Sequence, residues 1–189
     1  MTTQTVTTTD LSQLTGDYKI DPTHSRVGFL ARHALVTKVR GLFKEYEGSL
    51  KLDGDDPSNS TAELVVKVDS IDTGSFDRDA HLRTNDFFAM DEYPEISFVT
   101  TSITPEGETD FKVTGDLTMR GVTKPVTLDV EFLGSAVDAY GNQRVGFEGS
   151  VSVNRKDWGI NWNAALEAGG MLVSDKVTLE FEVAAVKVS

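Results

Sequence analysis

Apolar and polar residues alternate one by one along several long stretches of this chain. Between Val145 and Val153, apolar or small residues occupy every odd position. The stretches 111–119, 126–132 and 177–183 alternate in the same way. A period of two is typical of a β-strand with one face in a core and the other face in water. The sequence therefore predicts an all-β protein built from one-sided strands.

Weaker runs of the same kind complete a set of about eight strands. They cover residues 25–32, 42–52, 62–69 and 96–103. An antiparallel sheet of this size closes into a barrel or splits into a sandwich, and alternation alone does not choose between them. Two longer connections interrupt the strands, and each contains a segment that favours a short helix, 75–84 in the first and 164–168 in the second.

Short motifs follow one another in a fixed order through nearly the whole chain. They cover residues 21–25, 39–43, 71–73, 78–82, 86–88, 93–98, 115–123, 154–159 and 174–177. This ordered set resembles the YceI-like family, the lipocalin-like polyisoprenoid-binding proteins. The resemblance implies an eight-stranded antiparallel lipocalin-like β-barrel with one or two short helices in its long connections. It also implies binding of a long-chain amphiphile in the barrel lumen.

The length of 189 residues favours one domain with a sizeable core. Residues 1–15 are rich in threonine and polar, so we expect a disordered tail before a barrel domain over residues 16–189. The first ten residues lack the basic and apolar segments of a secretory signal. We therefore expect a cytoplasmic protein, although the resemblance includes many periplasmic relatives.

Charge and composition disfavour several functions. The net charge is −12 and the chain has no basic run, which disfavours binding to nucleic acid or to an anionic membrane surface. No stretch approaches the roughly 18 apolar residues of a membrane-spanning helix. The chain has no cysteine, no nucleophile elbow and no phosphate-binding or dinucleotide motif. We expect no enzyme activity and no cofactor.

The phase of the strands places small residues beside large aromatic ones on the inward face. The small ones are Ala62, Thr100, Ser102, Gly115 and Gly149, and the aromatic ones are Phe29, Phe98, Phe111, Phe132, Phe147 and Phe181. Such a mixture has two interpretations: it leaves an apolar lumen, or opposing side chains fill the space. The residues alone do not distinguish between these interpretations. The resemblance favours the lumen. On that hypothesis, Gly149→Phe blocks the lumen and leaves the fold largely intact.

We expect the lipid to contact eight residues chosen by strand phase and motif position, with Phe88 and Trp158 at the ends of the lumen. They are Phe29, Phe43, Phe88, Phe98, Leu117, Phe147, Val151 and Trp158. The main functional prediction is binding, sequestration or carriage of a polyisoprenoid such as an isoprenoid quinone. No stripe of residues requires a homodimer, and that question stays open.

Five polar motif residues are candidates for the rim of the barrel: His24, His33, His81, Arg120 and Arg155. Each arginine suits either a phosphate or quinone oxygen at the mouth or an ion pair with a nearby acid. The histidines lack the spacing of known metal motifs, so we expect them to stabilise loops and to bind no metal. Two alternatives stay open: a metal-dependent protein or enzyme that uses these histidines, and a filled barrel that binds a protein partner.

Overall fold

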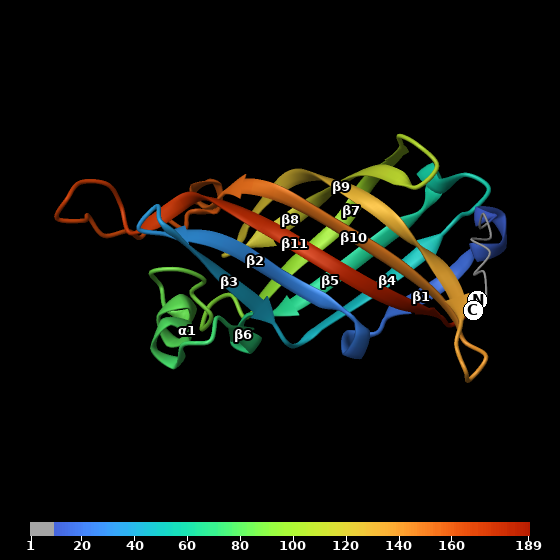
Figure 1. The fold of residues 1–189 in the computed structure, drawn as a ribbon, viewed down its shortest axis with the longest axis horizontal. Coiled ribbons are helices and arrows are strands. Elements are labelled where there is room, and N and C mark those ends of the chain that lie inside the picture. Colours follow the sequence, from blue (N-terminus) through green and yellow to red (C-terminus); the bar gives the residue numbers. More distant parts are fainter. Residues whose placement is uncertain (1–9) are drawn as a thin grey trace, which may run out of the picture.

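The computed structural model describes residues 10–189, which fold around one antiparallel sheet (Figure 1). The strands are β1 (Gly16–Ile20), β2 (Arg26–His33), β3 (Thr37–Phe43), β4 (Tyr46–Leu52), β5 (Thr61–Lys67), β6 (Ile71–Asp72), β7 (Glu95–Pro105), β8 (Asp110–Met119), β9 (Val122–Val137), β10 (Gln143–Asn154) and β11 (Val173–Lys187). Among the described residues, the one α-helix is α1 (Phe76–Arg83). The 3₁₀ turns are η1 (Leu11–Leu14), η2 (Pro22–His24), η3 (Pro57–Asn59), η4 (Val68–Ser70) and η5 (Arg155–Trp158).

Three pairs of consecutive strands run end to end, so these eleven strands act as eight long ones. Strands β1 and β2 pair with successive parts of β11, while β3 and β4 pair with β6 and β5. The ring closes because β1 pairs with β4 on one side and with β11 on the other. The described chain is therefore a closed eight-stranded antiparallel barrel of the lipocalin-like type, which confirms the predicted fold.

The barrel has two different ends (Figure 1). One end carries the C-terminus, η1 and the turns β4–β5, β7–β8 and β9–β10. The other carries α1, the β2–β3 turn and the long connection from η5 to β11. We call them the terminal end and the helix end. No helix in the described part of the chain is long and apolar enough to cross a membrane.

Local hydrogen bonds hold α1 at the helix end. Ser75 caps its first turn by accepting from the backbone of Arg78. The buried carboxylate of Asp79 accepts from the backbone and the hydroxyl of Thr73, at 2.9 and 2.5 Å. A helix of eight residues is marginal in isolation, so these bonds and its tertiary contacts stabilise it. The helix predicted over 75–84 is confirmed.

The second predicted helix, over 164–168, does not form. Residues 164–172 instead make a small hairpin in which Leu172 N–H donates to the Ala164 carbonyl at 2.8 Å and Leu166 N–H donates to Gly170 at 3.0 Å. Gly169 and Gly170 have φ of 87° and 91°, which suits a tight turn and interrupts a helix. We call residues 164–172 the finger.

The ordered domain begins before the predicted boundary at Thr15. Residues 1–9 of the expected tail lie outside the described residues, but Leu11–Leu14 forms a turn capped by Asp10. Leu14 is buried against other apolar side chains at the terminal end, and its carbonyl accepts from the hydroxyl of Tyr18 at 2.8 Å. The tail prediction is therefore wrong for residues 10–15, because two leucines suffice to anchor a mostly polar segment.

An arginine bridges two acids at the terminal end. Arg144 donates to Asp21 at 2.8 Å and to Asp138 at 2.7 Å, and so joins η2 to the β9–β10 turn. These bonds from Arg144 are the largest cause holding the pKa of each carboxyl well below its usual range. Thr23 and His24 also bond to Asp21, which lowers the pKa of that carboxyl further.

We expect Arg144→Met to lower the thermal midpoint at neutral pH, and we expect this deficit to shrink as the pH falls below about 4. A carboxylate whose pKa is lower in the folded chain stabilises the fold above its unfolded pKa. That stabilisation is lost as the pH falls toward the folded pKa. Thermal unfolding across acidic pH measures the difference, with Lys67→Met, which breaks an exposed pair with Glu95, as the control. A deficit that does not change with pH would contradict the role of the two acids.

Candidate functional site

A cavity of about 330 Å³ lies inside the barrel. This volume is within the range of roughly 300–1,000 Å³ that small-molecule pockets occupy. Every long strand contributes to its wall. The wall reaches Leu82, Phe88 and Ile160 at the helix end and Leu11 and Leu14 at the terminal end. The cavity therefore extends along most of the barrel.

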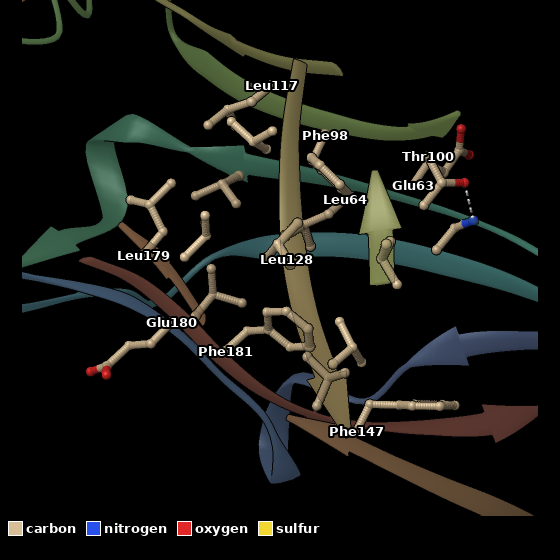
Figure 2. Close-up of a pocket in the computed structure, with 18 of the residues that line it drawn as sticks. Glu63, Leu64, Phe98, Thr100, Leu117, Leu128, Phe147, Leu179, Glu180 and Phe181 are labelled. Carbon is tan, nitrogen blue, oxygen red and sulfur yellow. Dashed lines mark hydrogen bonds between the residues drawn. The ribbon is translucent and has the colours of Figure 1, made fainter. Parts of the chain in front are cut away.

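The wall is predominantly apolar. Figure 2 shows side chains from β5, β7, β8, β9, β10 and β11 around one space, among them Leu64, Phe98, Leu117, Leu128, Phe147, Leu179 and Phe181. The hydroxyl of Thr100 already accepts from the backbone N–H of Ala62 at 2.9 Å. The carboxylate of Glu180 points away from this space. Such a wall suits the apolar chain of a ligand and offers it few polar partners.

Three phenylalanine rings lie over inward-facing glycines. The pairs are Phe29 over Gly41, Phe98 over Gly115 and Phe181 over Gly149. A Cβ added to these glycines would lie 2.2, 2.4 and 2.9 Å from the ring atoms, so any side chain there would displace the ring. The glycines thus leave no holes. They let large aromatic side chains pack close to the backbone, which keeps the inside of the barrel open.

Two expectations about small inward residues are wrong. A Cβ at Gly149 would lie 2.8 Å from the carbonyl oxygen of Asp129, so Gly149→Phe would disturb the backbone as well as the lumen. Ser102 does not line the cavity, because the register of β7 against β8 shifts between Thr100 and Ser102. Ile103 takes the inward position instead.

Seven of the eight residues predicted to contact the lipid line the cavity: Phe29, Phe43, Phe88, Phe98, Leu117, Phe147 and Val151. Trp158 does not, which corrects its expected place at the end of the lumen. Its ring is buried in the core, where its N–H is satisfied by donating to the Leu117 carbonyl at 2.9 Å. Sequence reasoning missed Ile160, because the long connection has no strand periodicity. It also missed Val173, which begins β11 before the alternating run that starts at Val177. Ligand contact by the seven stays a prediction.

The three histidines lie outside the cavity wall, on three different elements: η2, β2 and α1. His24 bonds to Asp21 at 2.7 Å, His33 is exposed at the end of β2, and His81 bonds to Asp86 at 2.8 Å. Within residues 10–189, no group of three or more His, Asp or Glu side chains is placed to hold a metal ion. The geometry favours local structural roles for the histidines.

Arg155 holds the long connection in place. The residue is only 4% exposed and borders the cavity. Nε donates to the Ser174 carbonyl at 2.9 Å, and Nη1 donates to the carbonyls of Ile160 and Trp162 at 2.7 and 2.9 Å. Nη2 has no hydrogen-bond partner and lies 3.8 Å from the carboxylate of Asp175. Burial lowers the pKa of this guanidinium, and Asp175 opposes that effect.

The other arginine, Arg120, also contacts the long connection. It lies in the β8–β9 turn with φ of 50° and donates to the carbonyl of Gly159 at 2.7 Å. It does not line the cavity. Both arginines therefore bond to backbone carbonyls of one segment, which was not among the partners considered from the sequence.

A cluster of three rings joins α1 to the long connection. The ring centroid of His81 lies 5.0 Å from that of Phe87 and 4.7 Å from that of Trp162. Phe87 and Trp162 are 5.4 Å apart. Nearby, the ring centroids of Phe43 and Phe88 lie 6.2 Å apart, and the two rings are close to perpendicular. The helix end is thus covered by two segments that pack through side chains.

The fold and the cavity define a class of protein: a closed antiparallel β-barrel with an apolar interior space, as in lipocalin-like binding proteins. The model of the YceI-like domain matches residues 18–185, and the chain belongs to the YceI-like family. A UPF0312 protein of Photorhabdus laumondii is 40% identical over 149 residues, which make up 78% of this chain and 77% of the relative.

Solved structures show the same fold. BcnA of Burkholderia cenocepacia has a TM-score of 0.77 at 23% identity and covers 87% of this chain and 98% of its own. A polyisoprenoid binding domain from Saccharophagus degradans has a TM-score of 0.67 at 17% identity, with 90% and 98% covered. At these identities the likeness shows the fold alone, and it agrees with the closed barrel.

Proposed function

We propose that this protein binds the apolar chain of a polyisoprenoid lipid inside its barrel. The observation that carries the proposal is the cavity, whose predominantly apolar wall extends from Leu14 to Leu82. Membership in the YceI-like family supports a lipid-binding barrel. A domain with the same fold is described as polyisoprenoid binding, and we extend that ligand class to this chain as part of the proposal. An isoprenoid quinone or another polyprenyl lipid fits this description.

Buried area accounts for the binding. Each buried CH₂ group contributes roughly 0.8 kcal/mol, so a five-carbon prenyl unit contributes several kcal/mol before the costs of ordering the chain. The wall supplies no row of polar groups that would select a head group. On this proposal, the length and slimness of the lipid chain therefore determine its affinity. We propose that the role is sequestration or carriage of the lipid, and that it takes place in the cytoplasm. We assign no catalytic residue and no cofactor.

The alternatives receive less support. A metal-dependent role would need several His, Asp or Glu side chains in one group, and within residues 10–189 no such group of three or more is placed to hold a metal ion. A filled barrel would leave no interior space, whereas this barrel contains a cavity.

We expect the affinity for linear prenols to rise by at least about tenfold with each added prenyl unit until the cavity is full. The reason is that each unit moves more apolar surface out of water. Titration of delipidated protein with geraniol, farnesol and geranylgeraniol, read by displacement of a lipophilic dye, measures this slope. An affinity independent of chain length would count against binding in the lumen.

A further inference from the structure

Two neighbouring hairpins at the helix end expose apolar side chains. The β2–β3 turn exposes Leu35 and Val36, at 63% and 77%, and the finger exposes Met171, at 51%. The β2–β3 turn is joined to the base of the finger by a hydrogen bond from Ala34 N–H to the Leu172 carbonyl at 2.7 Å. Both project beyond the barrel wall, on the left of Figure 1. We call Leu35, Val36 and Met171 the platform.

The β2–β3 turn is strained where it presents the platform. Ala34 and Leu35 have φ of 53° and 61°, a region that favours glycine or asparagine. A leucine is neither suited to this backbone nor buried here. Strain of this kind persists where the surrounding structure imposes it, and it concentrates at functional sites. The exposed Leu35 side chain therefore points to a binding role.

The charges around the platform are basic, although the protein as a whole is acidic. Arg32, His33 and Lys38 flank the tip and are exposed, and no acid lies between residues 32 and 43. The finger carries one acid, Glu167. Asp175 lies nearby but pairs with Lys156 at 3.2 Å.

Acids occur at both ends of the barrel. At the helix end, Asp77, Asp86, Asp91 and Glu92 are exposed on α1 or in the segment after it. Other acids lie in the turns of the terminal end, which Figure 1 places opposite the platform. They are Asp53, Asp55 and Asp56 in the β4–β5 turn, Glu106 and Glu108 in the β7–β8 turn and Asp138 in the β9–β10 turn. These three turns contain no lysine or arginine, whereas Arg32 and Lys38 flank the platform, so the net charge of −12 is not uniform over the surface. An anionic surface would repel the terminal end more strongly than the platform.

The platform lies next to the cavity. Ala31 on β2 and Val173 on β11 both line the cavity wall. Ala31 is a few residues before Leu35, and Val173 is two residues after Met171. An object bound to the platform thus lies beside the helix end of the lumen.

We propose that the platform docks on a phospholipid bilayer with anionic head groups. Leu35, Val36 and Met171 enter the interface, while Arg32 and Lys38 meet the lipid phosphates. The acidic terminal end then faces water. This inference rests on the proposed function in one respect: the bilayer is the source or the destination of the prenyl chain. It also revises the expectation that the net charge disfavours binding to an anionic membrane surface, because that expectation treated the protein's charge as uniform.

Leu35→Asn is the most direct test, because asparagine tolerates the backbone of this turn better than leucine does. We expect the variant to fold with an equal or higher thermal midpoint. We expect its partition onto vesicles of equal parts phosphatidylcholine and phosphatidylglycerol to fall at least about tenfold in co-sedimentation. Tyr140→Ser removes a side chain that is 89% exposed at the terminal end, and this control should partition as the wild type does.

Lys38→Glu provides a second variant with ordinary backbone geometry. It should weaken binding to the mixed vesicles and leave the weaker binding to pure phosphatidylcholine unchanged. The docking surface is overturned if the wild-type protein does not bind to the mixed vesicles. It is also overturned if both variants partition onto these vesicles as strongly as the wild type does. Uptake of geranylgeraniol in the absence of vesicles tests the proposed function separately. A protein that docks on vesicles but does not take up the prenol overturns only the proposed function. A protein that takes up the prenol but does not dock overturns only the docking surface.

Discussion

Val151→Trp is expected to weaken prenyl-lipid binding by about 100-fold while the barrel still folds. Val151 lies on β10 opposite Leu179 of β11, and both side chains line the cavity. An indole at this position would occupy space that about four chain carbons use. Displacing four buried carbons costs about 3 kcal/mol, which corresponds to that loss of affinity.

Dye displacement by geranylgeraniol measures the affinity of the Val151→Trp variant, and circular dichroism measures its fold. Val151→Leu is the matched control, because it changes the same position and fills much less of the cavity. It should bind with nearly wild-type affinity. If the tryptophan variant folds and binds the prenol as tightly as the wild type, the chain does not lie in the lumen.

Arg155→Met is expected to destabilise the fold by roughly 3 kcal/mol, because the carbonyls of Ser174, Ile160 and Trp162 lose their donor. The bond to Ile160 is buried and the other two are part-buried, and an acceptor left without a partner in such surroundings costs about 1 kcal/mol. For a chain of this size, the loss corresponds to a fall of about 6–12 °C in the thermal midpoint. Methionine fills much of the same volume, so the loss of hydrogen bonds dominates the effect.

The loosening caused by Arg155→Met should begin in the long connection. Hydrogen exchange is therefore expected to rise first over residues 159–174, and thermal unfolding gives the total loss. Lys156→Met is the matched control, because it removes only a half-exposed pair with Asp175 at 3.2 Å. Exposed pairs contribute about 0–1 kcal/mol. Equal losses in the two variants would show that Arg155 does not hold the connection.

The strands could be predicted because their alternation is local. In β9 and β10, nearly every inward residue is apolar and nearly every outward residue is polar, so the phase is evident in the sequence. The phase fails at Ser102, because a register shift in β7 depends on how β8 pairs with it. Closure of the ring depends on β1, a short strand whose partners lie far away in the chain.

The candidate site was predicted well on the strands and poorly in the connections. Phe29, Phe98 and Phe147 follow from strand phase, whereas Ile160 comes from a segment without periodicity. Arg155 shows the same limit, because its partners are backbone carbonyls, which side-chain chemistry in the sequence does not reveal. The packing of rings over glycines could not be predicted either, since it depends on which strands are neighbours.

Native mass spectrometry of freshly purified protein, followed by organic extraction of any bound lipid, tests the central claim most directly. We predict a discrete added mass that extracts as a prenyl lipid, and we predict that the Val151→Trp variant carries much less of it. A bare chain mass, together with no uptake of added polyprenyl lipid, would contradict the account.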